Sequence, residues 1–211
     1  MSPLHYRFEQ TLAWHCAPSL AGIKAADLLT WTVEGREGAD LLSHYAELLS
    51  SRGIRLYVLG ARRGRTLLLI FRPRQLDCWL AQAKVREMLD RAGYPVSRDT
   101  EAMLAHLRRR LQGGEFPHEI GLFLGYPPGD VEGFLRDGGR HCKLCGPWKV
   151  YDNVEEAARR FAAFHRCRDA LTQRVDRGVP RRVLILYSAV TAHWALTNIY
   201  HVNFYRRRFF L

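Results

Sequence analysis

The sequence predicts an α+β protein in which a small antiparallel sheet packs against several helices. Residues 54–59 and 65–71 are β-rich runs on either side of a glycine-bounded turn at 60–64, a pattern typical of a hairpin. Residues 148–151 (WKVY) resemble another strand of this sheet. Between the β-type runs, apolar residues recur at helical spacing, most regularly over residues 99–112.

The chain before the hairpin is predicted to be helical. Residues 4–16 have a helical pattern, and Pro18 should end that helix because the residue before a proline avoids the α region. A second, short helix is expected over residues 25–31. A third is expected over residues 39–51, where leucines and a tyrosine form one apolar face.

After the hairpin, two longer helices are expected. Residues 65–71 are apolar without alternation, which suits a strand covered on both faces, and Pro73 should stop it. Residues 75–91 carry an apolar stripe that drifts to a second face, so we expect this helix to be contacted from two sides. Residues 99–112 carry a single stripe, and Gly113 begins a glycine pair suited to ending a helix.

Residues 118–137 are predicted to form two short helices broken at residues 125–127 (Gly-Tyr-Pro). Asp130 is placed to cap the second of them. Asp152, followed three residues later by Glu155, forms a capping-box pattern that should open the next helix.

Length and composition predict a single α+β domain over residues 1–180 and a C-terminal appendage over residues 181–211, helical or poorly ordered. The chain has 211 residues, 47% of them hydrophobic and 25% charged, as in ordinary globular proteins. The appendage has the length of a membrane span, but His193, Asn198 and His201 make insertion costly, so we expect no span.

The net charge of +11 could attract nucleic acid or acidic ligands. The arginines are scattered, however, with groups near residues 62–65, 108–110 and 206–208. The second helix of the 118–137 pair has three acidic residues and one arginine, unlike a helix that reads DNA. We therefore expect no nucleic-acid partner.

The cysteines indicate a reducing compartment. Their number, five, is odd, their spacing is irregular, and no secretion signal precedes them. We expect a cytoplasmic protein with reduced thiols. The cysteines are Cys16, Cys78, Cys142, Cys145 and Cys167.

Three stretches of the chain resemble a known family. They are residues 12–29, residues 116–135 with the motif PHEIGLFLGYP, and residues 146–152 (GPWKVYD). In this order they are similar to domain-of-unknown-function family 3793, over about residues 4–180. The resemblance implies a small cytoplasmic bacterial protein and brings no activity with it. Candidate residues inside the family's pattern are His15, Cys16, Lys24, His118, Glu119, Asp130, Gly133, Trp148 and Lys149.

Cys16 and His118 are candidates for a catalytic pair. A thiolate becomes nucleophilic beside a histidine, which supplies both a base and a positive charge, and Glu119 could orient that histidine. The alternative is that Cys16 is a small buried apolar residue and that His118 makes a local hydrogen bond at a helix start.

A ligand pocket is expected where three segments converge: residues 15–24, 116–121 and 146–151. Loops at the ends of helices and strands can adopt a shape that surrounds a ligand. The predicted ligand-binding residues are His15, Lys24, Trp148 and Lys149, and one of the two lysines should supply positive charge for an anionic group.

Cys142 and Cys145 have the spacing of half a metal site, and His141 is adjacent. A structural zinc site needs a second pair of ligands, which the fold would have to supply from Cys16, His118 or Cys167. Zinc and iron are the candidate metals. Use of this pair in redox chemistry is the other reading of the motif.

Three functions remain open from the sequence. The first choice is a protein with a Cys/His pocket that binds a small ligand or a metal. The second is a thiol-dependent enzyme, a hydrolase or transferase, that uses Cys16 and His118. The third is a non-catalytic protein-interaction module.

Overall fold

The computed structural model describes residues 2–62, 64–113 and 115–177. The predicted appendage at residues 181–211 lies outside them. The helices are α1 (Pro3–Leu20), α2 (Gly35–Ser50), α3 (Pro73–Leu80), α4 (Ala83–Arg91), α5 (Thr100–Leu111), α6 (Ile120–Phe123), α7 (Pro128–Asp137) and α8 (Val154–Asp176). The strands are β1 (Ala26–Trp31), β2 (Arg55–Arg62), β3 (Arg65–Phe71), β4 (Leu144–Cys145) and β5 (Lys149–Val150).

The main sheet has three antiparallel strands in the order β1-β3-β2, so the α+β prediction is confirmed. The predicted hairpin pairs β2 with β3, and Leu68 of β3 lies between Leu29 of β1 and Val58 of β2. The last five residues of β3, from Leu67 to Phe71, are buried, as expected for a strand without alternation that is covered on both faces.

The prediction of a helix over residues 25–31 is wrong, because this segment is strand β1. Leu29 and Trp31 face one apolar cluster, whereas Ala26 and Leu28 face another, which is the alternation of a strand between two layers. A six-residue strand is too short for its pattern to distinguish helix from strand. Pairing with β3 decides the outcome.

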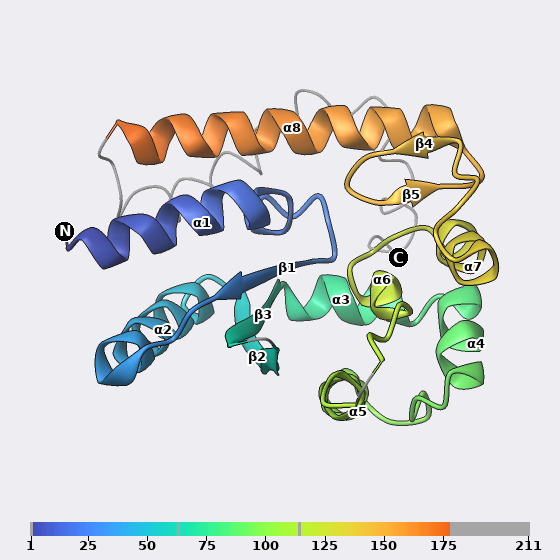
Figure 1. Ribbon diagram of the computed structural model, residues 1–211, viewed down its shortest axis with the longest axis horizontal. Coiled ribbons are helices and arrows are strands. Elements are labelled where there is room, and N and C mark those ends of the chain that lie inside the picture. The colour runs from blue at the N-terminus through green and yellow to red at the C-terminus, as the bar shows by residue number, and fades with distance from the viewer. Residues whose placement is uncertain (1, 63, 114, 178–211) are drawn as a thin grey trace, which may run out of the picture.

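Helices cover the sheet on both sides. One apolar cluster joins α1, α2 and the C-terminal half of α8 to one face of the sheet, and the other joins α3, α4, α5 and α6 to the opposite face. Figure 1 shows α1 and α8 running alongside each other, with the sheet on the other side of α1. The β4–β5 hairpin lies against the start of α8, away from the sheet.

Two helix boundaries differ from the predictions. Helix α1 does not stop before Pro18 but continues to Leu20, because a proline in the last turn removes only one backbone hydrogen bond, the one to the carbonyl of Trp14. The helix expected over residues 75–91 is instead the pair α3 and α4, with Gln82 at the N-cap position of the second. The drift of its apolar stripe marks the point where the chain turns.

The predicted break at residues 125–127 is confirmed, since it separates α6 from α7. The predicted strand at 148–151 exists as β5, but it pairs with β4 in a separate two-stranded sheet and does not join the main one. The predicted capping residue Asp152 is also wrong: the side chain of Asn153 caps α8 by accepting from the backbone N–H of Glu156.

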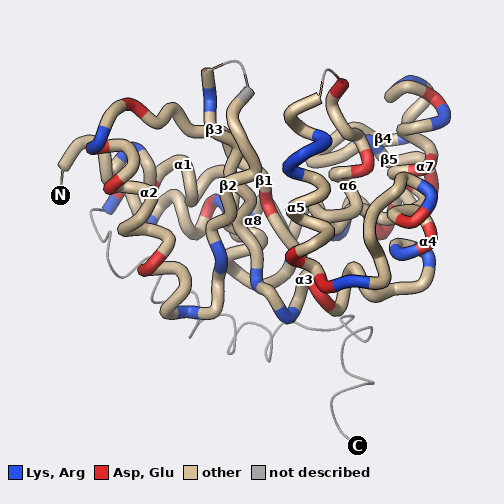
Figure 2. Tube along the Cα trace, turned by 90° about the horizontal axis from the view of Figure 1, so that it is seen from below, with Lys and Arg blue, Asp and Glu red and all other residues tan. Residues whose placement is uncertain are grey.

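Within the described ranges, no helix is long and apolar enough to cross a membrane. Lysine and arginine are spread over both ends of the molecule and are interleaved with acidic residues (Figure 2).

Candidate functional site

A pocket of about 360 Å³ lies between α6, α7 and the β4–β5 hairpin. Its walls are largely apolar and aromatic. One wall comes from the loop before α6 and from α6 itself, and the other from the turn of the hairpin. The aromatic lining residues are Phe116, Tyr126, Phe134 and Trp148, and the lining residues with ionisable side chains are His118, Asp130 and Lys149.

The buried carboxylate of Asp130 holds the hairpin against α7. Its Oδ2 atom accepts from Nε1 of Trp148 at 2.7 Å, and its Oδ1 atom accepts from the backbone N–H groups of Tyr151 at 2.7 Å and Asp152 at 3.2 Å. The sequence predicted that Asp130 caps α7. This prediction is wrong, because the oxygens of Asp130 are turned toward the hairpin. Each oxygen of this carboxylate, which is only 3% exposed, thus has at least one donor.

Gly133 permits the close approach of α7 to the hairpin. A Cβ atom at this position would lie 2.4 Å from Cγ of Tyr151, well inside van der Waals contact. In the same helix, a Cβ atom at Gly129 would meet nothing closer than 3.7 Å. Only the first of these two glycines is required by packing.

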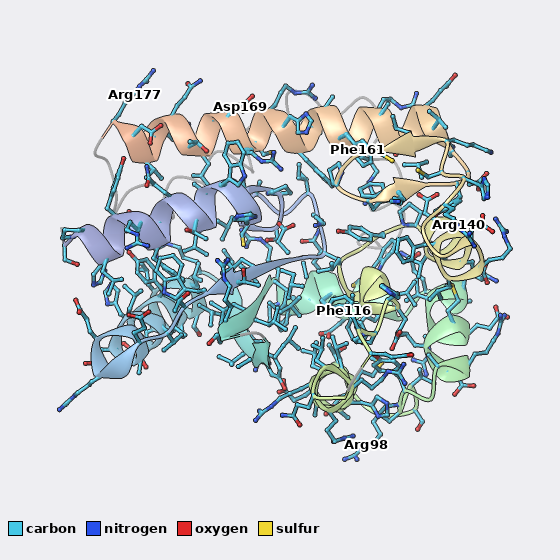
Figure 3. All side chains as sticks on the ribbon, in the orientation of Figure 1. Arg98, Phe116, Arg140, Phe161, Asp169 and Arg177 are labelled. Atoms are coloured by element: carbon cyan, nitrogen blue, oxygen red, sulfur yellow. The ribbon has the colours of Figure 1, made fainter. Side chains whose placement is uncertain are left out.

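The aromatic wall of the pocket is a stack built on Trp148. The ring of Tyr126 stacks on it at a centroid distance of 5.1 Å, and the hydroxyl of Tyr126 donates to the carbonyl of Pro147 at 3.1 Å. From α8, Phe161 points toward the hairpin (Figure 3) and meets Trp148 edge-on at 4.5 Å. The guanidinium of Arg160 lies 5.0 Å from the ring centroid of Trp148. The indole is thus fixed from several sides.

His118 and Lys149 supply the exposed polar groups of the lining. The His118 ring lies 4.9 Å from the ring of Phe134 and 5.7 Å from that of Phe116, and its side chain is exposed. Nζ of Lys149 donates to the carbonyl of Gly139, which holds the ammonium group at the hairpin side of the pocket. An ammonium group with three protons retains donors after making one such bond.

Lys24 lies behind the pocket. It forms a buried ion pair with Asp27, and its Nζ atom is 5.2 Å from the ring centroid of Tyr126, which lines the pocket. Burial by itself would lower the pKa of Lys24, but the Asp27 carboxylate, together with Tyr126 and Cys16, outweighs burial and raises it. Asp27 also accepts from the backbone N–H of Ser19 at 3.0 Å. Lys24 is therefore a charged, structural residue below the aromatic wall.

Cys16 is fully buried inside α1. Burial raises the pKa of its thiol well above the ordinary value, and the carboxylate of Asp27 raises it further. Its neighbour His15 has a lowered pKa, first because of burial and then because of Arg168. Of the three segments expected to converge, residues 116–121 and 146–149 line the pocket, and its lining within the described chain contains no residue from 15–24.

Glu119 faces away from the pocket. Its carboxylate accepts from the hydroxyl of Tyr94 at 2.9 Å and forms an ion pair of 2.6 Å with Arg110 of α5. Burial raises the pKa of Tyr94, and the charge of Glu119 adds to the rise. These contacts give Glu119 a structural role in joining the start of α6 to α5. They do not supply the orientation of His118 that a triad would need.

Cys142 and Cys145 lie side by side at the start of the hairpin, with their sulfur atoms 3.0 Å apart. In the part of the chain that the structure describes, no group of three or more His, Cys, Asp or Glu side chains is placed to hold a metal ion. The zinc or iron site expected from these two cysteines therefore lacks a third ligand among those residues.

A second hollow, of about 520 Å³, lies between the first turn of α1 and the N-terminal part of α2. It is wider but more open, and two of its lining side chains, Arg36 and Asp40, are 95% and 72% exposed. Side chains that project into solvent do not enclose a ligand. The pocket at the hairpin is the better-formed site.

The fold and the pocket define a small α+β protein with an aromatic pocket between a helix pair and a β-hairpin. The family model described as "Protein of unknown function (DUF3793)" matches residues 12–185, and the chain belongs to this family. The resemblance noted from the sequence is confirmed. Comparisons with curated proteins and with solved structures found no match.

Proposed function

We propose that this protein binds a small, flat ligand with an anionic group in the pocket between α6, α7 and the β4–β5 hairpin. The observation that carries the proposal is the combination of size and lining. A volume of about 360 Å³ with four aromatic side chains in its lining suits a planar molecule of one or two rings. The partly exposed rings of Phe116, Tyr126 and Phe134 offer surfaces that such a ring can contact. The buried indole of Trp148 supports Tyr126 from behind.

The polar side chains that line the pocket favour a ligand with a hydrogen-bond acceptor. The carboxylate of Asp130 already accepts three hydrogen bonds from donors inside the protein, and both of its oxygens take part. The groups left to recognise a ligand are the imidazole of His118 and the ammonium group of Lys149. Both can donate hydrogen bonds, and lysine carries a positive charge, so a carboxylate, sulfonate or phosphate is the favoured complement.

Ligand binding has more support than the thiol enzyme expected as an alternative. A nucleophilic cysteine needs access and a lowered pKa, whereas Cys16 is buried with a raised pKa. His118 lines the pocket, and Glu119 is engaged elsewhere. For these reasons the three residues are not proposed to act as a catalytic unit.

Fluorescence titration with anilinonaphthalene sulfonate, a planar aromatic sulfonate, tests the proposal. We expect saturable binding that Lys149→Met weakens about tenfold, because one charge-assisted hydrogen bond contributes about 1.5 kcal/mol. Lys143→Met is the matched control: it removes the same charge from the same hairpin region, outside the pocket lining. Equal affinities for the two variants, with both folded by circular dichroism, would contradict the proposal.

A further inference from the structure

The paired thiols at the start of the hairpin are arranged for a reaction that the pocket does not use. The sulfur atoms of Cys142 and Cys145 are 3.0 Å apart, whereas a disulfide bond is about 2.05 Å long, so closure needs a movement of about 1 Å. Both cysteines are free thiols, Cys145 is exposed and Cys142 is partly exposed. We propose that Cys142 and Cys145 form a reversible dithiol–disulfide site that exchanges with low-molecular-weight disulfides.

The backbone holds the two thiols together before any bond forms. The N–H of Lys143 donates to the carbonyl of Val150 at 2.8 Å, and the N–H of Gly146 donates to the carbonyl of Trp148 at 3.1 Å. His141 has a φ of 58°, a left-handed conformation that turns the chain into this loop. Because these contacts already fix the loop, little conformational entropy is lost when the ring closes.

The surroundings of Cys142 and Cys145 differ, and this difference assigns a separate role to each thiol. The hydrogen bond with Cys145 raises the pKa of Cys142, and the nearby ammonium group of Lys149 acts in the opposite direction. Cys142 is only partly exposed, so a small disulfide reaches it less easily and it suits the resolving role. Cys145, the more exposed thiol and the residue that pairs with Lys149 across the hairpin, suits the first attack.

The reaction balances with a disulfide of the glutathione type as oxidant. The thiolate of Cys145 attacks one sulfur of the small disulfide, forming a mixed disulfide and releasing one thiolate, which takes up the proton that Cys145 lost. Cys142 then attacks the sulfur of Cys145, releasing the second small thiol with the proton of Cys142. The two cysteines are oxidised to one disulfide, and the small disulfide is reduced to two thiols.

The other cysteines provide internal controls. Cys16 and Cys167 are buried and should stay unmodified in the folded protein, whereas Cys78 is exposed on α3. Cys78 can form a mixed disulfide with glutathione. It lies in a different part of the fold from the hairpin pair, so its adduct should persist.

The test is intact-mass and peptide mass spectrometry of the folded, full-length protein incubated with oxidised glutathione. For the wild type and for Cys78→Ser, we expect the peptide with residues 142–145 to lose two hydrogen atoms and to recover them with dithiothreitol. In Cys142→Ser, the reaction should stop at a glutathione adduct on Cys145. Stable, separate adducts on both thiols, or no reaction at either while Cys78 reacts, would overturn the proposal.

A metal measurement separates this site from a metal site. The reduced protein, purified without a histidine tag, is titrated with zinc in the presence of a chromogenic chelator. Under the proposal, Cys142→Ser leaves zinc retention unchanged. Stoichiometric zinc that is lost in this variant and that protects both thiols from glutathione would overturn the proposal. Neither result depends on whether the pocket binds a ligand.

Discussion

The two halves of helix α8 pack against different kinds of structure. Its C-terminal half belongs to the large apolar cluster that joins α1, α2 and one face of the sheet, through Cys167, Leu171 and Val175. Its N-terminal half belongs to a small cluster with the hairpin, through Ala157, Phe161 and Phe164. One helix therefore supports both a layered core and the region that forms the pocket.

This difference separates two sources of stability. Around the main sheet, large apolar surfaces are buried on both faces, and the Lys24–Asp27 ion pair is sealed inside. Around the pocket, strands of two residues each are held by the carboxylate of Asp130 and by a few aromatic contacts. A change near the sheet should affect the whole fold, whereas a change near the pocket should affect the hairpin first.

The largest effect is expected at the buried ion pair. Asp27→Ala leaves the charge of Lys24 buried without a partner, so the free energy of unfolding should fall by about 3–5 kcal/mol. Urea denaturation measures this change. The double variant Lys24→Met/Asp27→Asn removes both charges and keeps an acceptor for the N–H of Ser19, so it should recover most of the loss. If Asp27→Ala were as stable as the wild type, the ion pair would not stabilise the region around the main sheet.

A smaller and local effect is expected at Asp130. Asp130→Ala removes the acceptor for three donors and should cost about 2–3 kcal/mol. Hydrogen exchange should increase over residues 144–151 and stay unchanged in the main sheet. Asp169→Ala, at an exposed position of α8, is the control (Figure 3). Equal loss of protection in β1 and β3 would remove the distinction between the two regions.

The contact between α7 and the hairpin can be tested with two glycines of one helix. Gly133→Ala places a methyl group 2.4 Å from Tyr151 and should destabilise the protein by about 1–3 kcal/mol. Gly129→Ala meets nothing closer than 3.7 Å and should be neutral or stabilising by up to about 1 kcal/mol, because alanine favours helices. Thermal unfolding compares the two variants. The same melting temperature for both would mean that α7 and the hairpin are less closely packed than described.

The smallest expected effect is a pH dependence of the free energy of unfolding that comes from Glu9, in the region around the main sheet. Burial raises the pKa of Glu9 above its ordinary value of 4.5, although a hydrogen bond from Tyr45 and the nearby His5 and His44 lower it. A raised pKa in the folded state means that the stability this group contributes is present at low pH and is lost as pH rises through the folded pKa. Glu9→Gln should therefore gain stability relative to the wild type as pH increases above 4.5, by less than about 1 kcal/mol.

Urea denaturation across that pH range checks this prediction. Glu47→Gln, at an exposed position of α2, should show no such trend. If the stability of Glu9→Gln relative to the wild type fell as pH rises, the prediction would be contradicted.

The sequence predicted elements whose signals are local and missed those that depend on tertiary partners. The hairpin of β2 and β3 and the break between α6 and α7 follow from glycine and proline positions, and both are present. Strand β1 was missed, because a six-residue apolar run becomes a strand only beside β3. The burial of Cys16 was one of two alternatives that the sequence left open, and tertiary packing decides between them, since Cys16 lies in the apolar cluster that α1 forms with α2, α8 and the sheet.

The candidate site was predicted in part. The family-like motifs contain the residues that line the pocket, including His118, Trp148 and Lys149. The role of Asp130 could not be predicted, because its donors come from positions 18 to 22 residues further along the chain, on a hairpin that no local pattern places beside α7. Gly133 was a usable signal, because a glycine inside a helix often marks a close contact.

The most direct test of the proposed binding site is NMR mapping with naphthalene sulfonate on the uniformly ¹⁵N-labelled protein. The indole N–H of Trp148, assigned with Trp148→Phe, and the backbone amides of residues 116–134 and 146–149 should shift and saturate as the probe is added. The amides of α1 and α2 should stay in place. Shifts centred on the open hollow between α1 and α2, or no saturable shift at the hairpin, would contradict the account of the pocket as a ligand site.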